Sequence, residues 1–154
     1  MTQDDWIPDE QWATIVEAVP IVSVDLVIRR ENRIALGKRR NNPARGEWFV
    51  PGGRLKKGEQ LETAVHRVAH EETGLNIKIM QQLGGYEHHY TVSDIDGVDK
   101  HYIPIGFVVA APTGALATDT QHADLRWFEP PFESIDLHQY VRKYLVDAGL
   151  LAVE

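Results

Sequence analysis

The chain has 154 residues, a length that suits one domain with a single hydrophobic core, and we expect that domain to span residues 1–154. Its 16 Lys and Arg residues are outnumbered by 23 Asp and Glu residues, and the net charge of -7 argues against nucleic acid as a partner, because nucleic-acid-binding domains carry a basic surplus. The absence of cysteine excludes a disulfide framework and fits a reducing compartment.

The N-terminal stretch MTQDDWIPDE is acidic and lacks the basic start and the apolar run of a signal peptide. No stretch of about 18 consecutive apolar residues, the length that spans a bilayer, occurs in the sequence. We therefore expect a soluble, cytoplasmic protein without a membrane partner.

Two elements are predicted at the start of the chain. Residues 8–19 predict a helix, because their large apolar side chains share one helical face: Trp12, Ile15, Val16 and Val19. Residues 21–30 predict a strand buried on one side, because apolar side chains alternate with others along it: Val22, Val24, Leu26 and Ile28.

The rest of the chain adds more strands and a final helix. Strands are predicted at 33–40, 47–53 and 125–130, and a long hairpin joins 75–92 to 100–111 across a turn-prone segment. Residues 134–150 predict an amphipathic helix from apolar positions at helical spacing: Leu137, Tyr140, Val141, Tyr144, Leu145 and Ala148. The pattern indicates an α/β (α+β) fold with a mixed sheet, helices packed on it and one core.

A further helix after residue 60 places a carboxylate on its apolar face. At 100° per residue, Leu61, Ala64, Val65, Val68 and Ala69 form one arc, and the Glu72 side chain projects into it. Burying an unpaired carboxylate is costly, so Glu72 should pair with a cation or bind a metal. The alternative is that the helix ends before Glu72 and that Arg67 and Glu71 form an ordinary ion pair at its edge.

The residues around this helix resemble the signature of the Nudix hydrolases. That box reads G-x5-E-x7-R-E-U-x-E-E-x-G-U, where U is a bulky aliphatic residue, and the chain matches it without a gap at Gly53, Glu59, Arg67, Glu71, Glu72, Gly74 and Leu75. The preceding PGGR suits a sharp turn that offers peptide groups and a forked Arg54 guanidinium to a phosphate. The resemblance implies a Nudix-type mixed β-sheet packed between helices.

One position departs from the box, because Val68 stands where the glutamate after Arg67 belongs and the small Ala69 follows it. The missing glutamate belongs to the metal-binding and water-activating set of ordinary members. In this departure the chain resembles the GDP-mannose mannosyl hydrolase branch, whose box is altered at the same place and which cleaves a sugar carbon–oxygen bond. Segments from about Trp12 to Glu129 are similar to that branch, whose members are typically dimers, whereas the C-terminal helix is generic.

The resemblance implies a divalent-metal site and a general base. The ligands would be the Gly52 carbonyl, the Glu72 carboxylate and the Gln121 amide, which suit Mg²⁺, with Mn²⁺ as a substitute. His122 would activate water for attack on the anomeric carbon. Taken alone, Gln121 and His122 read as solvated loop residues, and Glu71 either holds Arg67 or takes part in a second metal shell.

The resemblance also implies a set of substrate-binding residues. Arg39 and Arg54 would clamp the diphosphate, and Tyr102 would donate to a phosphate oxygen. Asp25 and His88 would hold the sugar hydroxyls, and Trp12 would lie against the nucleotide. The competing interpretations are an edge carboxylate for Asp25, a core tyrosine for Tyr102 and simple helix packing for Trp12.

We therefore expect Mg²⁺-dependent hydrolysis of a GDP-sugar, GDP-mannose or GDP-glucose, to GDP and free sugar. One alternative is a conventional Nudix pyrophosphohydrolase that cleaves the P–O–P bond of a nucleoside diphosphate sugar or of ADP-ribose. Another is a Nudix-fold module that binds a nucleotide and cleaves nothing. His66 and His70, four residues apart, have zinc spacing but fall opposite the apolar arc, which favours a solvated face.

Overall fold

The computed structural model describes residues 7–40, 45–91, 95, 97–117 and 122–153, with the backbone alone at His122 and Ala123. Its strands are β1 (Ile21–Arg30), β2 (Arg33–Arg39), β3 (Trp48–Phe49), β4 (Gly52–Arg54), β5 (Lys78–Gly85), β6 (His88–Tyr90), β7 (Lys100–Ala110) and β8 (His122–Phe128). Its helices are α1 (Asp9–Ala18), α2 (Leu61–Thr73) and α3 (Gln139–Asp147), with a short 3₁₀ turn, η2 (Phe132–Ser134). Within these ranges the order of helices and strands is the predicted one.

The strands form the predicted mixed sheet. The central path is β3-β2-β1-β7-β5, while β4 pairs with β1, β6 with β7 and β8 with β2. β1 runs parallel to β7, and the remaining pairs described are antiparallel. The two segments of the predicted hairpin do meet, since both β5 and β6 pair with β7.

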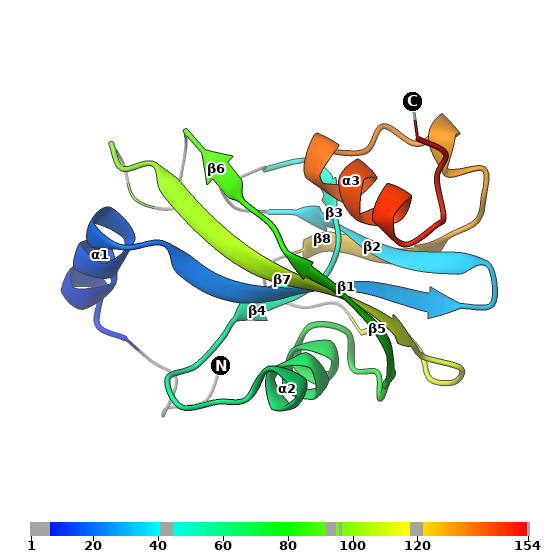
Figure 1. Cartoon of the computed structure of the whole chain (residues 1–154), viewed down its shortest axis with the longest axis horizontal. Helices are drawn as coiled ribbons and strands as arrows, with labels where there is room; N and C mark the ends of the chain where they lie inside the picture. Colours follow the sequence, from blue (N-terminus) through cyan, green and yellow to red (C-terminus); the bar gives the residue numbers. More distant parts are fainter. Residues whose placement is uncertain (1–6, 41–44, 92–94, 96, 118–121, 154) are drawn as a thin grey trace.

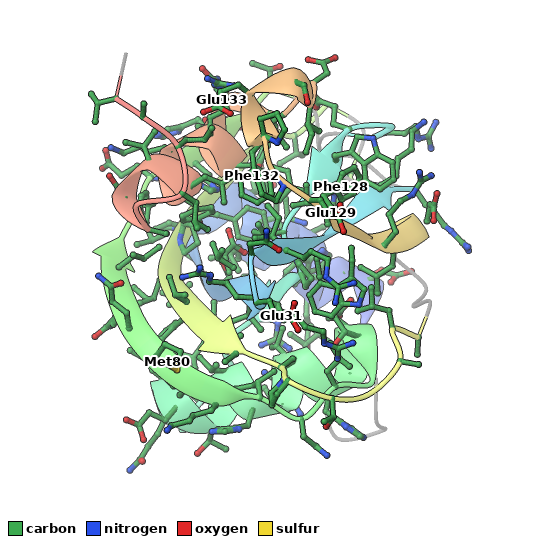
Figure 2. The ribbon with its side chains drawn as sticks, turned by 90° about the vertical axis from the view of Figure 1, so that its right-hand side faces the viewer. Glu31, Met80, Phe128, Glu129, Phe132 and Glu133 are labelled. Atoms are coloured by element: carbon green, nitrogen blue, oxygen red, sulfur yellow. The ribbon has the colours of Figure 1, made fainter. Side chains whose placement is uncertain are left out.

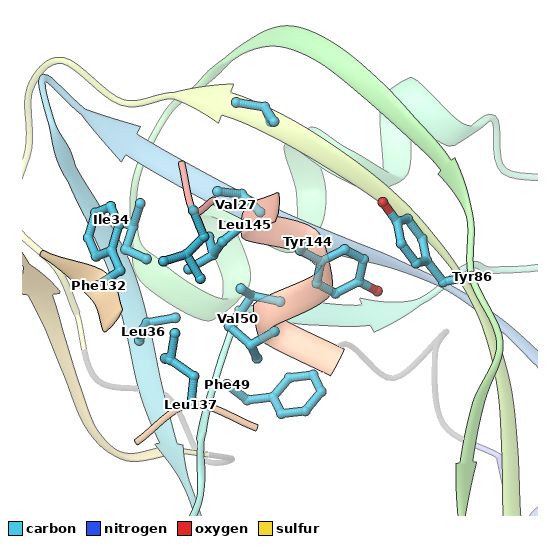
Figure 3. Close-up of a cluster of buried hydrophobic side chains, with 13 residues drawn as sticks. Val27, Ile34, Leu36, Phe49, Val50, Tyr86, Phe132, Leu137, Tyr144 and Leu145 are labelled. Atoms are coloured by element: carbon cyan, nitrogen blue, oxygen red, sulfur yellow. The ribbon is translucent and has the colours of Figure 1, made fainter. Parts of the chain in front are cut away.

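Helices α2 and α3 lie on opposite faces of this sheet (Figure 1). In the view turned by 90°, Phe132 lies on the α3 side and Met80 lies on the edge strand β5, where its side chain is exposed (Figure 2). Each helix covers its own cluster of buried side chains, one built around Tyr144 and Leu145 and the other around Val65 and Val68. The first cluster is drawn in Figure 3.

The prediction that the first strand is buried on one side was wrong. β1 is central, and its two faces are covered by different helices: Val24, Leu26 and Ile28 belong to the α2-side cluster, whereas Val27 belongs to the α3-side cluster. The alternation of apolar residues along β1 therefore identified only the face that α2 covers, and not the second buried face under α3.

Two boundaries also differ from the predictions. The segment predicted as one strand at 47–53 is two short strands, β3 and β4, separated by Val50 and Pro51. The final helix begins at Gln139 rather than near residue 134, because the Nδ1 atom of His138 accepts a hydrogen bond from the Tyr140 backbone N–H at 3.0 Å and caps its first turn. Leu137 is nevertheless buried, as expected from its place in the apolar pattern.

Helix α2 has the predicted geometry. Ala64, Val65, Val68 and Ala69 are buried, and Glu72 is half-buried on the same arc. The helix ends at Thr73 and is capped by Gly74, whose φ of 75° lies in the left-handed region that glycine adopts without strain. The alternative in which the helix ends before Glu72 was wrong.

Candidate active site

A charged network fixes the loop that precedes α2. The Arg67 guanidinium donates to both oxygens of Glu59, at 2.7 and 2.9 Å, and to the backbone carbonyl of Arg54 at 2.9 Å. Its third contact is with Glu71 at 3.1 Å. Glu71 therefore holds Arg67, which was one of the two predicted roles for that residue.

The paired charges in this network stabilise one another. The hydrogen bonds from Arg67 lower the pKa of Glu59, and those to Glu59 raise the pKa of Arg67. Because Arg67 spans Glu59 before the helix and the Arg54 carbonyl on β4, it fastens the start of α2 to the sheet.

Helix α2 meets β4 at a glycine. A Cβ atom on Gly53 would lie 3.0 Å from a methyl group of Val68, so the absence of a side chain lets the helix approach closely. Val68 is only 1% exposed and belongs to the core. The residue that replaces the box glutamate is thus an apolar packing residue, and Glu72 follows it one turn later with its Oε2 atom buried.

The oxygen atoms of Gly52 and Glu72 are suitable ligands for a hard divalent cation. A backbone carbonyl at Gly52 and a half-buried carboxylate at Glu72 are oxygen ligands of the kind that Mg²⁺ prefers. His66 and His70 are exposed, as the solvated-face interpretation predicted. Across the described ranges, no three His, Cys, Asp or Glu side chains gather closely enough to hold a metal, and the remaining predicted ligand, Gln121, lies outside those ranges.

Asp25 occupies the α3 side of β1, next to the same turn. Its register partners are Gly52 on β4 and Gly106 on β7. A Cβ atom on Gly52 would overlap the Oδ1 atom of Asp25, so the carboxylate lies directly against that glycine. The side chain is 12% exposed, which excludes the interpretation of Asp25 as an ordinary edge carboxylate.

Tyr144 on α3 donates a hydrogen bond to the Oδ2 atom of Asp25 at 2.6 Å. Burial raises the pKa of Asp25 to about 6, although this hydrogen bond and the positive charge of Arg39 act in the opposite direction. A carboxylate with this pKa changes its protonation close to neutral pH, where it can exchange hydrogen bonds with hydroxyl groups as donor or as acceptor.

His88 lies beside Asp25, as the resemblance implied. Its Nδ1 atom is 4.0 Å from Asp25 Oδ2, and its ring stacks on Tyr140 with the two centroids 3.9 Å apart. Burial lowers the pKa of His88 to about 4, and neighbouring His138 adds to this effect. The imidazole is therefore neutral near pH 7, so its contact with Asp25 is a dipolar one and not an ion pair.

Arg39 links Asp25 to the strand that carries the predicted base. Its charge acts on both Asp25 and Tyr90, and its register partner across the sheet is His122 on β8. His122, the first residue of β8, therefore has its backbone opposite Arg39 in the sheet. The side chain of His122 lies outside the described part of the structure, and so does all of Gln121.

Two of the three remaining predicted substrate contacts, Trp12 and Tyr102, lie around the ammonium group of Lys100. The Lys100 Nζ atom lies 5.0 Å from the centre of the Trp12 ring and 5.2 Å from that of Tyr102. Tyr102 in turn contacts Tyr90, with ring centroids 6.3 Å apart. Trp12 thus packs its helix against β7, and Tyr102 lies at the end of the aromatic cluster that includes His88. Arg54 is half-buried at the end of β4 and pairs in the sheet with Ser23 on β1.

Sequence reasoning missed the residues that α3 contributes. Tyr140 and Tyr144 were assigned to the apolar face of a generic helix, yet Tyr140 stacks on His88 and Tyr144 binds Asp25. A signal was present, because a buried tyrosine needs a partner for its hydroxyl group and these two stand four residues apart. The position of the partner could not be read from the sequence.

Three findings place the chain among known proteins. The Nudix domain model matches residues 19–144. Low-salt glycan biosynthesis protein Agl8 of Haloferax volcanii is 53% identical over 90% of this chain and 88% of the relative. ADP-ribose pyrophosphatase of Methanocaldococcus jannaschii is 33% identical over 82% and 73% of the two chains.

Solved structures agree with this relationship. A MutT Nudix hydrolase from Burkholderia pseudomallei has a TM-score of 0.68 and 28% identity, covering 84% of this chain and 98% of that one. The Nudix domain of Shewanella oneidensis NrtR, solved with ADP-ribose, has a TM-score of 0.68 at 18% identity over 97% of both chains and supports the fold alone. None of the described helices is long and apolar enough to cross a membrane. The chain belongs to the Nudix hydrolase family.

Proposed function

We propose that this Nudix hydrolase acts on a nucleoside diphosphate sugar, with GDP-mannose as first candidate and GDP-glucose as second, and releases GDP and free sugar. The observation that carries the proposal is Val68, buried against Gly53 where the box has a glutamate. Helix α2 then supplies one carboxylate fewer for activating water at phosphorus, so the proton of the attacking water must go elsewhere. The glycan biosynthesis relative supports a sugar in the substrate.

Mg²⁺, or Mn²⁺ in its place, would be held by the Gly52 carbonyl, Glu72 and Gln121. When bound, the cation neutralises the negative charge that collects on the departing diphosphate. Arg39 and Arg54 supply forked donors for the same diphosphate oxygens, and Tyr102 supplies a hydroxyl donor.

The sugar is held on the α3 side. The Nδ1 atom of His88 lies 4.0 Å from the Oδ2 atom of Asp25. A carboxylate next to a neutral imidazole can exchange hydrogen bonds with two neighbouring hydroxyl groups of a hexose. Trp12 is proposed to contact the nucleotide. Water attacks the anomeric carbon, the bond from that carbon to the β-phosphate oxygen breaks with its electron pair leaving on GDP, and the water proton passes to the His122 imidazole.

The second candidate is cleavage of the P–O–P bond of a nucleoside diphosphate sugar or ADP-ribose. One observation favours it, namely the relative named ADP-ribose pyrophosphatase. Hydrolysis in ¹⁸O-labelled water separates the two candidates, since label in the free sugar supports attack at carbon and label in a phosphate refutes it. GDP-, UDP- and ADP-sugars assayed side by side define the base and the sugar.

His122→Gln tests the proposed base. We expect turnover to fall by orders of magnitude with a modest change in substrate affinity, because the affected step is proton transfer. Near-normal turnover would remove His122 from the mechanism.

The homodimer and the cytoplasmic location also stay predictions. Measuring the size of the protein in solution tests the first, and cell fractionation tests the second.

A further inference from the structure

Tyr144 connects the C-terminal helix to the proposed sugar site. It is fully buried, with 0% of its surface exposed, and its hydroxyl donates to Asp25 Oδ2 at 2.6 Å across 119 positions of sequence. Burial raises the pKa of Tyr144 well above its usual range, with the charge of Asp25 and the hydrogen bond to it adding to the effect. The phenol therefore stays a donor throughout the working pH range.

The sheet leaves room for this contact. Gly106 lies directly opposite Asp25 on β7, and a Cβ atom there would come within 3.0 Å of the Tyr144 ring. On the other side of Asp25, Gly52 leaves space for the Oδ1 atom of the carboxylate. Asp25 is thus flanked by two residues without side chains, one of which accommodates the tyrosine that binds it and the other the carboxylate itself.

The two oxygens of Asp25 consequently have different surroundings. Tyr144 holds Oδ2, and His88 Nδ1 is 4.0 Å from the same atom. Oδ1 lies on the side of Gly52, the residue whose carbonyl is proposed to bind the metal. A hydrogen bond to one oxygen of a carboxylate restricts its rotation and so fixes where the other oxygen points.

We infer that Tyr144 is a positioning residue for the sugar subsite: by holding one oxygen of Asp25, it directs the other toward a sugar hydroxyl. This inference rests on the proposed function, since it requires Asp25 to contact the sugar. It assigns to α3 a part in substrate selection, because a nucleoside diphosphate without a sugar does not use the aligned oxygen.

A matched control lies beside Tyr144. The Tyr86 hydroxyl also donates to an aspartate, Asp147, at 2.6 Å, and its ring also lies against Gly106 at 3.1 Å from the position of an added Cβ. The two rings contact each other edge to face, with centroids 4.5 Å apart, and Figure 3 shows them side by side. Tyr86→Phe therefore removes an equivalent hydrogen bond without touching Asp25.

The experiment compares Tyr144→Phe with Tyr86→Phe in the full chain. For each variant we would measure the Kd for GDP and for the intact nucleoside diphosphate sugar bound with Ca²⁺ in place of Mg²⁺, and kcat and KM with Mg²⁺. We expect Tyr144→Phe to weaken binding of the nucleotide sugar about tenfold, as loss of a hydrogen bond to a charged group predicts, with the affinity for GDP unchanged. Tyr86→Phe should leave both affinities within about twofold.

Two outcomes overturn the inference. One is equal behaviour of the two variants, and the other is a parallel loss of affinity for GDP and for the nucleotide sugar, which would mark a purely structural role. The assays use whichever nucleoside diphosphate sugar the wild-type chain hydrolyses, so failure of GDP-mannose as substrate counts against the proposed function alone.

A folding measurement tests the contact independently of activity. Urea unfolding of Tyr144→Phe, Asp25→Asn and the double variant forms a thermodynamic cycle, and we expect the two substitutions to be non-additive. Additive effects would show that the hydroxyl and the carboxylate do not act on one another, and would overturn the inference even where the affinities agree with it.

Discussion

On the α2 side of the sheet the carboxylates are neutralised by a guanidinium, whereas on the α3 side a carboxylate is held by a phenol. Arg67 binds Glu59 and Glu71, and the Arg67 side chain remains 19% exposed. Asp25 instead lies among aromatic rings, with Tyr144 as donor. The hydrogen bonds from Arg67 lower the pKa of Glu59, whereas burial raises the pKa of Asp25 to about 6.

This difference separates two tasks. A network of paired charges beside β4 suits a cation and a diphosphate. A carboxylate that exchanges hydrogen bonds with hydroxyl groups suits an uncharged sugar. Four predictions test whether the α2 side and the α3 side contribute independently to activity and stability, beginning with the largest expected effect.

Glu72→Gln should abolish the response to Mg²⁺ and lower turnover by at least about a hundredfold, the cost typical of losing one electrostatic contact at a reacting centre. Glu62→Gln, an exposed carboxylate of the same helix, is the control and should stay close to wild type. Steady-state rates over a range of Mg²⁺ concentrations provide the measurement. An unchanged Mg²⁺ dependence in Glu72→Gln would refute its assignment as a ligand.

Arg67→Met should lower the free energy of unfolding by about 2 kcal/mol, because Glu59 and the Arg54 carbonyl lose their shared donor while remaining partly buried. Arg45→Met is the control, since the Arg45 side chain donates to the backbone of Arg40 at the surface. Urea denaturation measures both. If the sides are independent, the effects of Arg67→Met and Tyr144→Phe on stability will add.

Gly106→Ala should cost about 1–2 kcal/mol, because the new methyl group displaces two buried rings, Tyr144 and Tyr86. Gly85→Ala is the matched control, since its Cβ would lie 3.7 Å from an Ile105 methyl group, an ordinary contact. Thermal unfolding distinguishes them. Equal melting temperatures would mean that the rings have space to move and that Gly106 is not needed as clearance.

Asp25→Asn should change the pH dependence of stability. In the wild type, the raised pKa of Asp25, about 6, lets the folded state bind a proton between pH 6 and 4, which favours folding as the pH falls. The lowered pKa of His88, about 4, lets only the unfolded state bind a proton there, which disfavours folding as the pH falls. The two contributions oppose one another, so we expect little net slope from this pair.

Removing Asp25 leaves the contribution of His88 alone. The unfolding free energy of Asp25→Asn should therefore fall, relative to wild type, by up to about 1.4 kcal/mol per pH unit between pH 6 and 4. Urea titrations at several pH values, in buffer without divalent cations, measure this slope. Parallel curves for the two proteins would contradict the opposing shifts.

The two sides also differ in how far the sequence predicts them. Glu59, Arg67 and Glu72 lie within 14 positions, and helical geometry alone placed Glu72 on the apolar arc and Arg67 beside Glu71. Spacing within one helix is a local property, so it can be read without the fold.

The α3 side depends on contacts between distant segments. Asp25 and His88 were paired only through a family resemblance, and nothing in the spacing brought Tyr144 to Asp25. The burial of both faces of β1 was missed for the same reason, because periodicity within a strand does not reveal what packs on it. Gln121 and the His122 side chain, which the proposed chemistry also needs, lie outside the described residues.

The hydrogen bond between Tyr144 and Asp25 has a consequence for synthesis of the chain. At ribosomal rates of about 5–20 residues per second, the 119 positions between them correspond to a delay of roughly 6–24 s. Arg67 follows Glu59 by 8 positions and emerges within about 2 s of it. The ionic corner can therefore form while the chain is still growing, whereas Asp25 lacks its donor until the C-terminal helix has been made.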